Sequence, residues 1–152
     1  MSRGIASPMA ADVGSIVLGT DFGPTSAAAE RAAIELARQR RTVLVVVHAI
    51  DPGRLRLPGG LWRERIDQAR TARERDAKLL VASARDAGVS ARVLIWTGDA
   101  ASCVLDAARA EHADRIVLGS HGRGRLGRAI AGSVVDVVRR RADCPVEVVA
   151  AG

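Results

Sequence analysis

Short apolar runs alternate with longer amphipathic stretches along most of this chain. The apolar runs are rich in valine, isoleucine and leucine, as expected of strands buried on both faces. They predict strands at Ser15–Gly19, Thr42–Ala49, Val89–Trp96, Asp114–Leu118 and Val146–Ala150. The stretches between them place apolar residues near helical spacing and predict helices at Ala27–Arg40, Leu61–Ala87, Asp99–His112 and Ser133–Arg141. Strands that alternate with helices pair in parallel, so the pattern predicts an α/β domain with a parallel sheet.

Individual residues mark where these elements begin and end. Thr25 is a predicted N-cap for the first helix, and Asp99 is a predicted N-cap for the third. Gly88 is placed to form the turn that ends the long second helix. Asp51–Gly60 holds two prolines and three glycines, which predicts a loop.

Parallel sheets of this kind bind ligands outside the carboxyl ends of their strands, where the strand order reverses. Two segments follow such strand ends, Gly19-Thr20-Asp21 and Gly119-Ser120-His121. The pattern does not establish whether these two strands are neighbours.

The length of 152 residues fits one domain, which we expect to span residues 15–152 after a flexible segment at residues 1–14. No apolar run approaches the roughly 18 residues of a membrane helix. The start of the chain also lacks the basic and apolar regions of a signal peptide. We therefore expect a cytoplasmic protein.

The net charge of +6 comes almost entirely from arginine. Arginines stand beside acids on the predicted helices, as in Arg73-Glu74-Arg75-Asp76, which is typical of solvated helix faces. The only aromatic residues are Phe22, Trp62 and Trp96, too few for a base-stacking platform, so nucleic acid is an unlikely partner. The two cysteines suit core positions, and they form neither a disulfide framework nor a zinc motif.

The segment from Gly119 to Gly132 reads GSHGRGRLGRAIAG and leads from a strand to a helix. Glycines let the backbone approach a ligand closely, and the helix that follows offers free N–H groups to a phosphate. Ser133 can serve either as a plain N-cap of that helix or as a hydrogen-bond donor to a phosphate oxygen. Arg123, Arg125 and Arg128 add positive charge, whether for a ligand or only for solvent.

Two well-known phosphate motifs do not explain this segment. A P-loop needs Gly-Lys before Ser or Thr, whereas the single lysine, Lys78, follows an alanine. The spacing of Gly122, Gly124 and Gly127 matches a dinucleotide fingerprint, but that motif normally opens the first βαβ unit of a chain, and Asp143, the acid considered for it here, lies in a turn. We regard that match as incidental.

A wider spacing in the same segment resembles the universal stress proteins. Gly119-x2-Gly122-x9-Gly132-Ser133 is similar to the ATP-binding motif of that family. Further similar segments are Ile16-Val17-Leu18-Gly19-Thr20-Asp21, Val47-His48-Ala49, Thr97-Gly98-Asp99 and Asp143-Cys144-Pro145-Val146. The resemblance spans Ser15 to Ala150, nearly the whole chain.

The resemblance implies a three-layer α/β/α fold of the adenine nucleotide alpha hydrolase-like type. Its parallel sheet would have five strands in the order 3-2-1-4-5. The implied ligand is ATP, with Mg²⁺, and the family also implies a homodimer formed through Val146–Ala150. Thr20 and Asp21 would lie by the nucleoside, Ala49 by the adenine, and the glycines and Ser133 by the ribose and phosphates. The implied nucleotide-binding residues are Thr20, Asp21, Ala49, Gly119, His121, Gly122, Arg123, Gly132, Ser133 and Val134.

Candidate catalytic groups do not form a convincing set. His48 suits a satisfied histidine at a strand end, His121 suits an ordering role in its loop, and His112 suits a helix end. Asp21 fits equally a magnesium ligand and a residue that caps the turn before Pro24. We therefore expect no catalytic residues and no protein-bound metal site, and a regulatory module that binds ATP in the stress response. A slow ATPase and a partner-binding stress protein without nucleotide remain the alternatives.

Overall fold

The computed structural model describes residues 14–55, 61–120 and 134–151. Its strands form one parallel sheet in the order β3-β2-β1-β4-β5, which confirms the predicted fold class. The strands are β1 (Ser15–Gly19), β2 (Leu44–Ile50), β3 (Ala91–Thr97), β4 (Ala113–Ser120) and β5 (Val146–Ala150). The helical elements are η1 (Pro24–Ser26), α2 (Ala27–Arg40), α3 (Pro52–Leu55), α4 (Trp62–Asp86) and α5 (Ala100–Ala110), with a further helix at residues 134–141.

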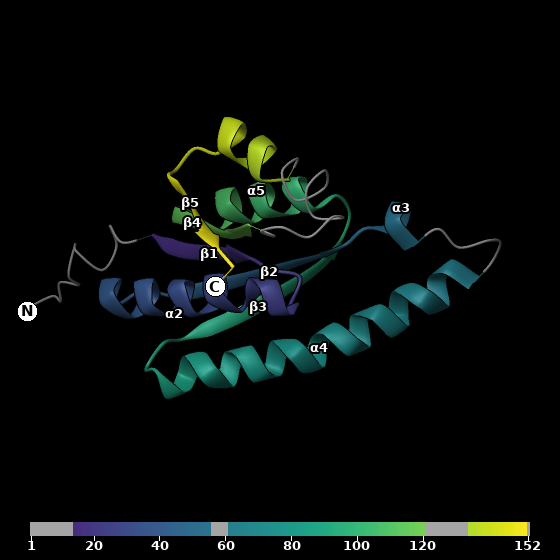
Figure 1. The fold of residues 1–152 in the computed structure, drawn as a ribbon, viewed down its shortest axis with the longest axis horizontal. Coiled ribbons are helices and arrows are strands. Elements are labelled where there is room, and N and C mark those ends of the chain that lie inside the picture. Colours follow the sequence, from purple (N-terminus) through teal and green to yellow (C-terminus); the bar gives the residue numbers. More distant parts are fainter. Residues whose placement is uncertain (1–13, 56–60, 121–133, 152) are drawn as a thin grey trace, which may run out of the picture.

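Helices cover both faces of this sheet, as Figure 1 shows. Residues of α2 and α4 pack on one face against Ile16, Leu18 and Val46. Residues of α5 and the 134–141 helix pack on the other face against Val17, Val45 and neighbouring strand residues. Because successive strand residues point to opposite faces, each central strand contributes to both cores and reads as a continuous apolar run.

The start of the first helix differs from the prediction. A 3₁₀ turn, η1, precedes α2, so the N-cap position belongs to Ser26 and not to Thr25. The Ser26 side chain makes no capping bond to the helix; its hydroxyl donates instead to Asp21 Oδ1, at 2.7 Å. The predicted Thr25 cap is therefore wrong, because a contact within the preceding turn sets the start of this helix.

Other boundaries shift by a few residues. Asp99 caps α5 as predicted, since its carboxylate accepts a hydrogen bond from the Ser102 N–H at 2.9 Å. Gly88 follows α4 with a φ of 81°, the left-handed conformation that glycine adopts readily. The α5 helix ends at Ala110, so His112 lies in the turn before β4 with a φ of 50°.

Two segments that we predicted as loop are ordered structure. Residues 52–55 of the predicted loop Asp51–Gly60 form the short helix α3. Strand β4 continues to Ser120 instead of ending at Leu118, because β5 pairs beside its last residues, Gly119 with Val149 and Ser120 with Ala150. The first glycine of the predicted motif is therefore a strand residue.

Candidate functional site

The carboxyl ends of three strands meet at one edge of the sheet. Gly19, the last residue of β1, pairs with Val47 of β2 on one side and with Leu118 of β4 on the other. The two segments left unplaced by the sequence are therefore neighbours, and the strand order reverses between them. The structure brings Thr20, Asp21, Ala49 and Gly119 to this edge, which we call the carboxyl edge.

Close packing explains why β1 ends in glycine. A Cβ at Gly19 would lie 2.7 Å from Leu118 Cδ2 and 2.9 Å from Val104 Cγ2, both too short. At Gly119 the nearest described atom to a Cβ would be the Cβ of Ala29, at 3.5 Å, which is an ordinary contact. A larger residue at the end of β1 would therefore force Leu118 or Val104 to shift, whereas at Gly119 the described residues leave room for a side-chain carbon.

Thr20 joins the carboxyl edge to α2. Its side chain is buried, and its hydroxyl donates to Glu30 Oε1 at 2.7 Å. The same oxygen accepts from the Phe22 N–H at 2.9 Å. Both contacts hold the chain where it leaves β1. Together they use the hydroxyl hydrogen of Thr20 and one lone pair of its Oγ1.

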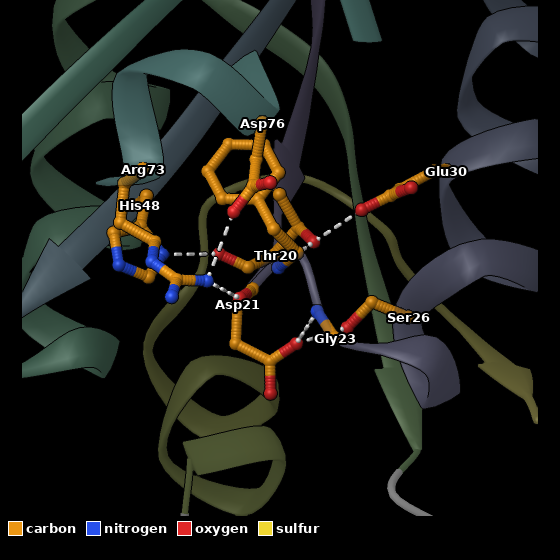
Figure 2. A network of polar contacts seen from close by, with 9 residues as sticks. Thr20, Asp21, Gly23, Ser26, Glu30, His48, Arg73 and Asp76 are labelled. Atoms are coloured by element: carbon orange, nitrogen blue, oxygen red, sulfur yellow. Dashed lines mark hydrogen bonds and ion pairs between the residues drawn. The ribbon is translucent and has the colours of Figure 1, made fainter. Parts of the chain in front are cut away.

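Asp21 organises the turn that follows β1, as Figure 2 shows. Its Oδ1 accepts from the Gly23 N–H and from the Ser26 hydroxyl, each at 2.7 Å. Between these groups, Phe22 has a φ of 61°, an uncommon conformation for a residue other than glycine. Of the two roles considered for Asp21, the structure shows that of capping the turn.

His48 closes the turn from the side of β2. Its Nδ1 lies 2.8 Å from the Thr20 carbonyl oxygen, so Nδ1 carries the hydrogen and donates it. Its ring lies against the ring of Phe22, with 5.3 Å between the centroids. Burial lowers the pKa of His48, and Arg73 adds to this effect, while the Thr20 hydrogen bond, Asp21 and Asp76 oppose it. These contacts suit a structural role for His48.

Sequence reasoning missed Arg73, which we assigned to a solvated helix face. The side chain reaches from α4 to the turn after β1, where Nη1 donates to the Asp21 carbonyl oxygen at 3.4 Å. The same nitrogen lies 3.0 Å from Asp76 Oδ2, one turn further along α4 (Figure 2). No local pattern could have identified this contact, because its partners are 52 residues apart in the chain.

Several predicted site residues lie outside the described residues: His121, Gly122, Arg123, Gly132 and Ser133. Val134 is the first described residue of the next helix, and it packs, partly buried, on the α5 side of the sheet. The structure thus describes five of the ten predicted residues: Thr20, Asp21, Ala49, Gly119 and Val134.

A pocket of about 300 Å³ lies near the opposite, amino edge of the sheet, away from the predicted site. It is lined by Leu105, Ala108, Arg109, His112, Ala113, Ala142, Asp143 and Cys144. Within the described parts of the chain, no three His, Cys, Asp or Glu side chains are grouped to hold a metal ion. Nor does any helix there have the length and apolar character needed to cross a membrane.

Comparison with known proteins finds relatives of similar sequence and similar structure. The chain is 33% identical over 130 residues to a universal stress protein of Thermus aquaticus, covering 84% of this chain and 90% of that one. It is 29% identical over 136 residues to a universal stress protein of Methanocaldococcus jannaschii, covering 88% of this chain and 80% of that one. The crystal structure of a universal stress family protein from Burkholderia pseudomallei matches with a TM-score of 0.74 and 27% identity, over 95% of this chain and 98% of that one.

Two further similar structures contain nucleotides. One is a universal stress protein in complex with cAMP, with a TM-score of 0.69 and 21% identity over 92% of this chain and 98% of that one. The other is the Archaeoglobus fulgidus protein in complex with dAMP, with a TM-score of 0.67 and 24% identity over 88% and 95%. At these identities the likeness shows the fold. The model of the universal stress protein family matches residues 13–150, and the chain belongs to this family.

Proposed function

We propose that this chain binds an adenine nucleotide, ATP with Mg²⁺, at the carboxyl edge and acts as a regulatory module of the stress response. The observation that carries the proposal is the reversal of strand order between β1 and β4. The helix that follows β1, α2, covers one face of the sheet, and the helix that follows β4, at residues 134–141, covers the other. The two connections therefore diverge at the carboxyl edge, which is where open α/β sheets take their ligands.

The ligand-bound relatives and the glycine spacing support a nucleotide at this edge. In the proposed complex Thr20 and Asp21 lie by the nucleoside and Ala49 by the adenine. Gly119, Gly122, Gly132 and Ser133 hold the ribose and phosphates. The proposed set of nucleotide-binding residues also includes His121, Arg123 and Val134. The turn after β1 is already fixed by its own hydrogen bonds, so this wall of the site costs little further ordering when a ligand binds.

The described part of the edge favours holding a nucleotide over cleaving it. The Thr20 hydroxyl hydrogen is donated to Glu30, the Asp21 carboxylate holds the turn, and His48 Nδ1 is bound to a carbonyl oxygen. Each of these contacts maintains the local backbone. We therefore expect at most weak hydrolysis, and a time course of ADP release with saturating ATP and Mg²⁺ measures it.

Isothermal titration with ATP tests the proposal. The unaltered protein is expected to bind ATP, and Gly132→Val is expected to abolish binding because a side chain would fill the space proposed for the phosphates. Gly124→Val is the matched control, since Gly124 lies in the same segment but outside the spacing Gly119, Gly122, Gly132 and Ser133. It should bind ATP like the unaltered protein.

The possible outcomes separate the alternatives. Equal binding by the two valine variants would refute the motif assignment. No binding by the unaltered protein, and no nucleotide released from it on denaturation, would favour a partner-binding protein that uses no nucleotide.

The proposal includes a homodimer formed through β5. This strand is at the end of the sheet, so one side of its backbone has no neighbouring strand among the described residues. The open side of an outer strand is suited to pairing with a second copy of the chain.

A further inference from the structure

Arg73 connects α4, a helix that flanks the sheet, to the backbone of the carboxyl edge. Its side chain is 35% exposed, so it is neither buried nor fully solvated. The ion pair with Asp76 holds the guanidinium beside the Asp21 carbonyl oxygen (Figure 2). The planar guanidinium can hold several acceptors at once in a fixed geometry, whereas a lysine cannot.

We propose that Arg73 is a positioning residue of the nucleotide site: it holds the Asp21 peptide and thereby sets the affinity for the nucleoside. The inference rests on the proposed function, because the Asp21 peptide matters to a ligand only if the ligand binds at the carboxyl edge. Arg73 acts here through the backbone and without touching the phosphates.

Two carbonyl groups of the turn after β1 are bound by side chains from other elements. The N–H groups of Phe22 and Gly23 are bound by side chains of the same segment, Thr20 and Asp21. The Gly23 carbonyl accepts from the Ser26 N–H within the turn, whereas the carbonyl groups of residues 20 and 21 are bound by other elements of the fold. His48 of β2 donates to the carbonyl of residue 20, and Arg73 of α4 donates to that of residue 21.

The left-handed backbone of Phe22 makes these partners important. This conformation is strained for a residue other than glycine, so the turn tends to relax when its contacts are removed. Removal of the Arg73 contact leaves the Asp21–Phe22 peptide held at its N–H by Thr20 but no longer by Arg73 at its carbonyl, so the peptide can tilt. A tilted peptide changes the groups presented to a nucleoside.

A second arginine on the same helix provides a matched control. Arg70, one turn earlier in α4, donates to the Ile95 carbonyl oxygen at 2.7 Å and to the Thr97 hydroxyl at 3.2 Å. It therefore ties α4 to the end of β3 and not to the turn after β1. If the docking of α4 alone determined affinity, a change at Arg70 would have the same effect as a change at Arg73.

The experiment is calorimetric titration of ATP and of adenosine into the unaltered protein, Arg73→Gln, Arg73→Lys and Arg70→Gln. Arg73→Gln is expected to weaken both ligands about fivefold, and equally, because one long charged hydrogen bond to the nucleoside-facing backbone is lost. Arg73→Lys should restore part of the affinity. Arg70→Gln should bind both ligands like the unaltered protein.

Three results would overturn the inference while leaving the proposed function intact. These are unchanged affinity in Arg73→Gln, an equal loss in Arg70→Gln, and a loss for ATP with none for adenosine, which would indicate a direct phosphate contact. Absence of binding by the unaltered protein would instead overturn the proposed function and this inference with it. If Arg73→Gln does not fold, Asp76→Asn removes the ion-pair partner of the guanidinium, and it should weaken both ligands in the same way.

Discussion

Thr20 shows how a single buried hydroxyl can fix the exit from a strand. Its donor bond to Glu30 reaches α2, and its acceptor bond from the Phe22 N–H shapes the turn. Removal of the hydroxyl would leave two polar partners inside the fold with fewer contacts, which is more costly than losing an exposed hydrogen bond.

We predict that Thr20→Val lowers the free energy of unfolding by about 1–2 kcal/mol. Thr20→Ser keeps the hydroxyl and should lose much less. Thr25→Val, at the exposed position that the sequence suggested as a cap, should be nearly neutral. Urea denaturation of the three variants measures these differences, and a Thr25→Val loss as large as that of Thr20→Val would contradict the role assigned to Thr20.

His48 makes part of the stability dependent on pH. Because burial holds its pKa below the usual value of about 6.5, the folded state favours the neutral ring. The stabilising contribution is therefore complete above pH 6.5 and is lost as the pH falls through the lower pKa of the folded state.

We expect His48→Asn to reduce this pH dependence, since its amide can donate in place of Nδ1–H but does not titrate. The difference in unfolding free energy between the unaltered protein and the variant should become smaller as the pH falls from 7 toward 5. His112→Asn, at an exposed histidine, serves as the control and should follow the unaltered protein. A constant difference for His48→Asn across that range would argue against a buried neutral ring.

At the scale of elements, helix starts depend on contacts of different range. Asp99 caps α5 through a group three residues away, Ser102, so the sequence pattern was sufficient to predict it. The start of α2 depends on the bond between Ser26 and Asp21 within a turn, and the pattern suggested the wrong cap. A cap that bonds within its own helix can therefore be predicted from sequence. Where several residues could cap the same helix, the conformation of the preceding turn determines which of them stands at the N-cap position.

Asp99→Ala should destabilise the protein by about 1 kcal/mol, the usual cost of losing an N-cap. Asp106→Ala is the matched control on the same helix. Its side chain is 69% exposed, and its pair with Arg109, at 3.8 Å, is of a kind that contributes little. Thermal unfolding of both variants tests this, and equal midpoints would contradict the capping role.

The strands and the fold were predictable because buried parallel strands are continuous apolar runs. Strand ends were less predictable, since the extension of β4 to Ser120 depends on β5, a strand much later in the chain. The contacts of the carboxyl edge were the hardest to predict. Thr20 with Glu30 and Arg73 with Asp21 join residues 10 and 52 positions apart, at distances that only the folded chain establishes.

At the scale of the whole molecule, the sheet has two outer strands, β3 and β5, and the proposed dimer uses β5. In that strand, Val148 is partly exposed. A charged side chain at this position would be buried without a partner if two copies of β5 met there.

We predict that Val148→Lys shifts the protein from dimer to monomer in light scattering coupled to size-exclusion chromatography. Leu79→Lys is the matched control, because Leu79 is 72% exposed on α4, on a different element. It should leave the dimer intact. A Val148→Lys protein that remains fully dimeric would direct attention to the other outer strand, β3.

The central place of β1 also affects how the chain folds while it is being synthesised. Strand β1 can pair with β2 early, since Ile16 meets Leu44, but its other side waits for β4, where Ser15 meets Ala113. A nascent chain therefore carries an unpaired side of β1 until β4 has been synthesised, a condition that exposes chains to misassembly. The carboxyl edge is complete only after β4 has left the ribosome, so a ligand that needs this edge can stabilise the protein only from that point onward.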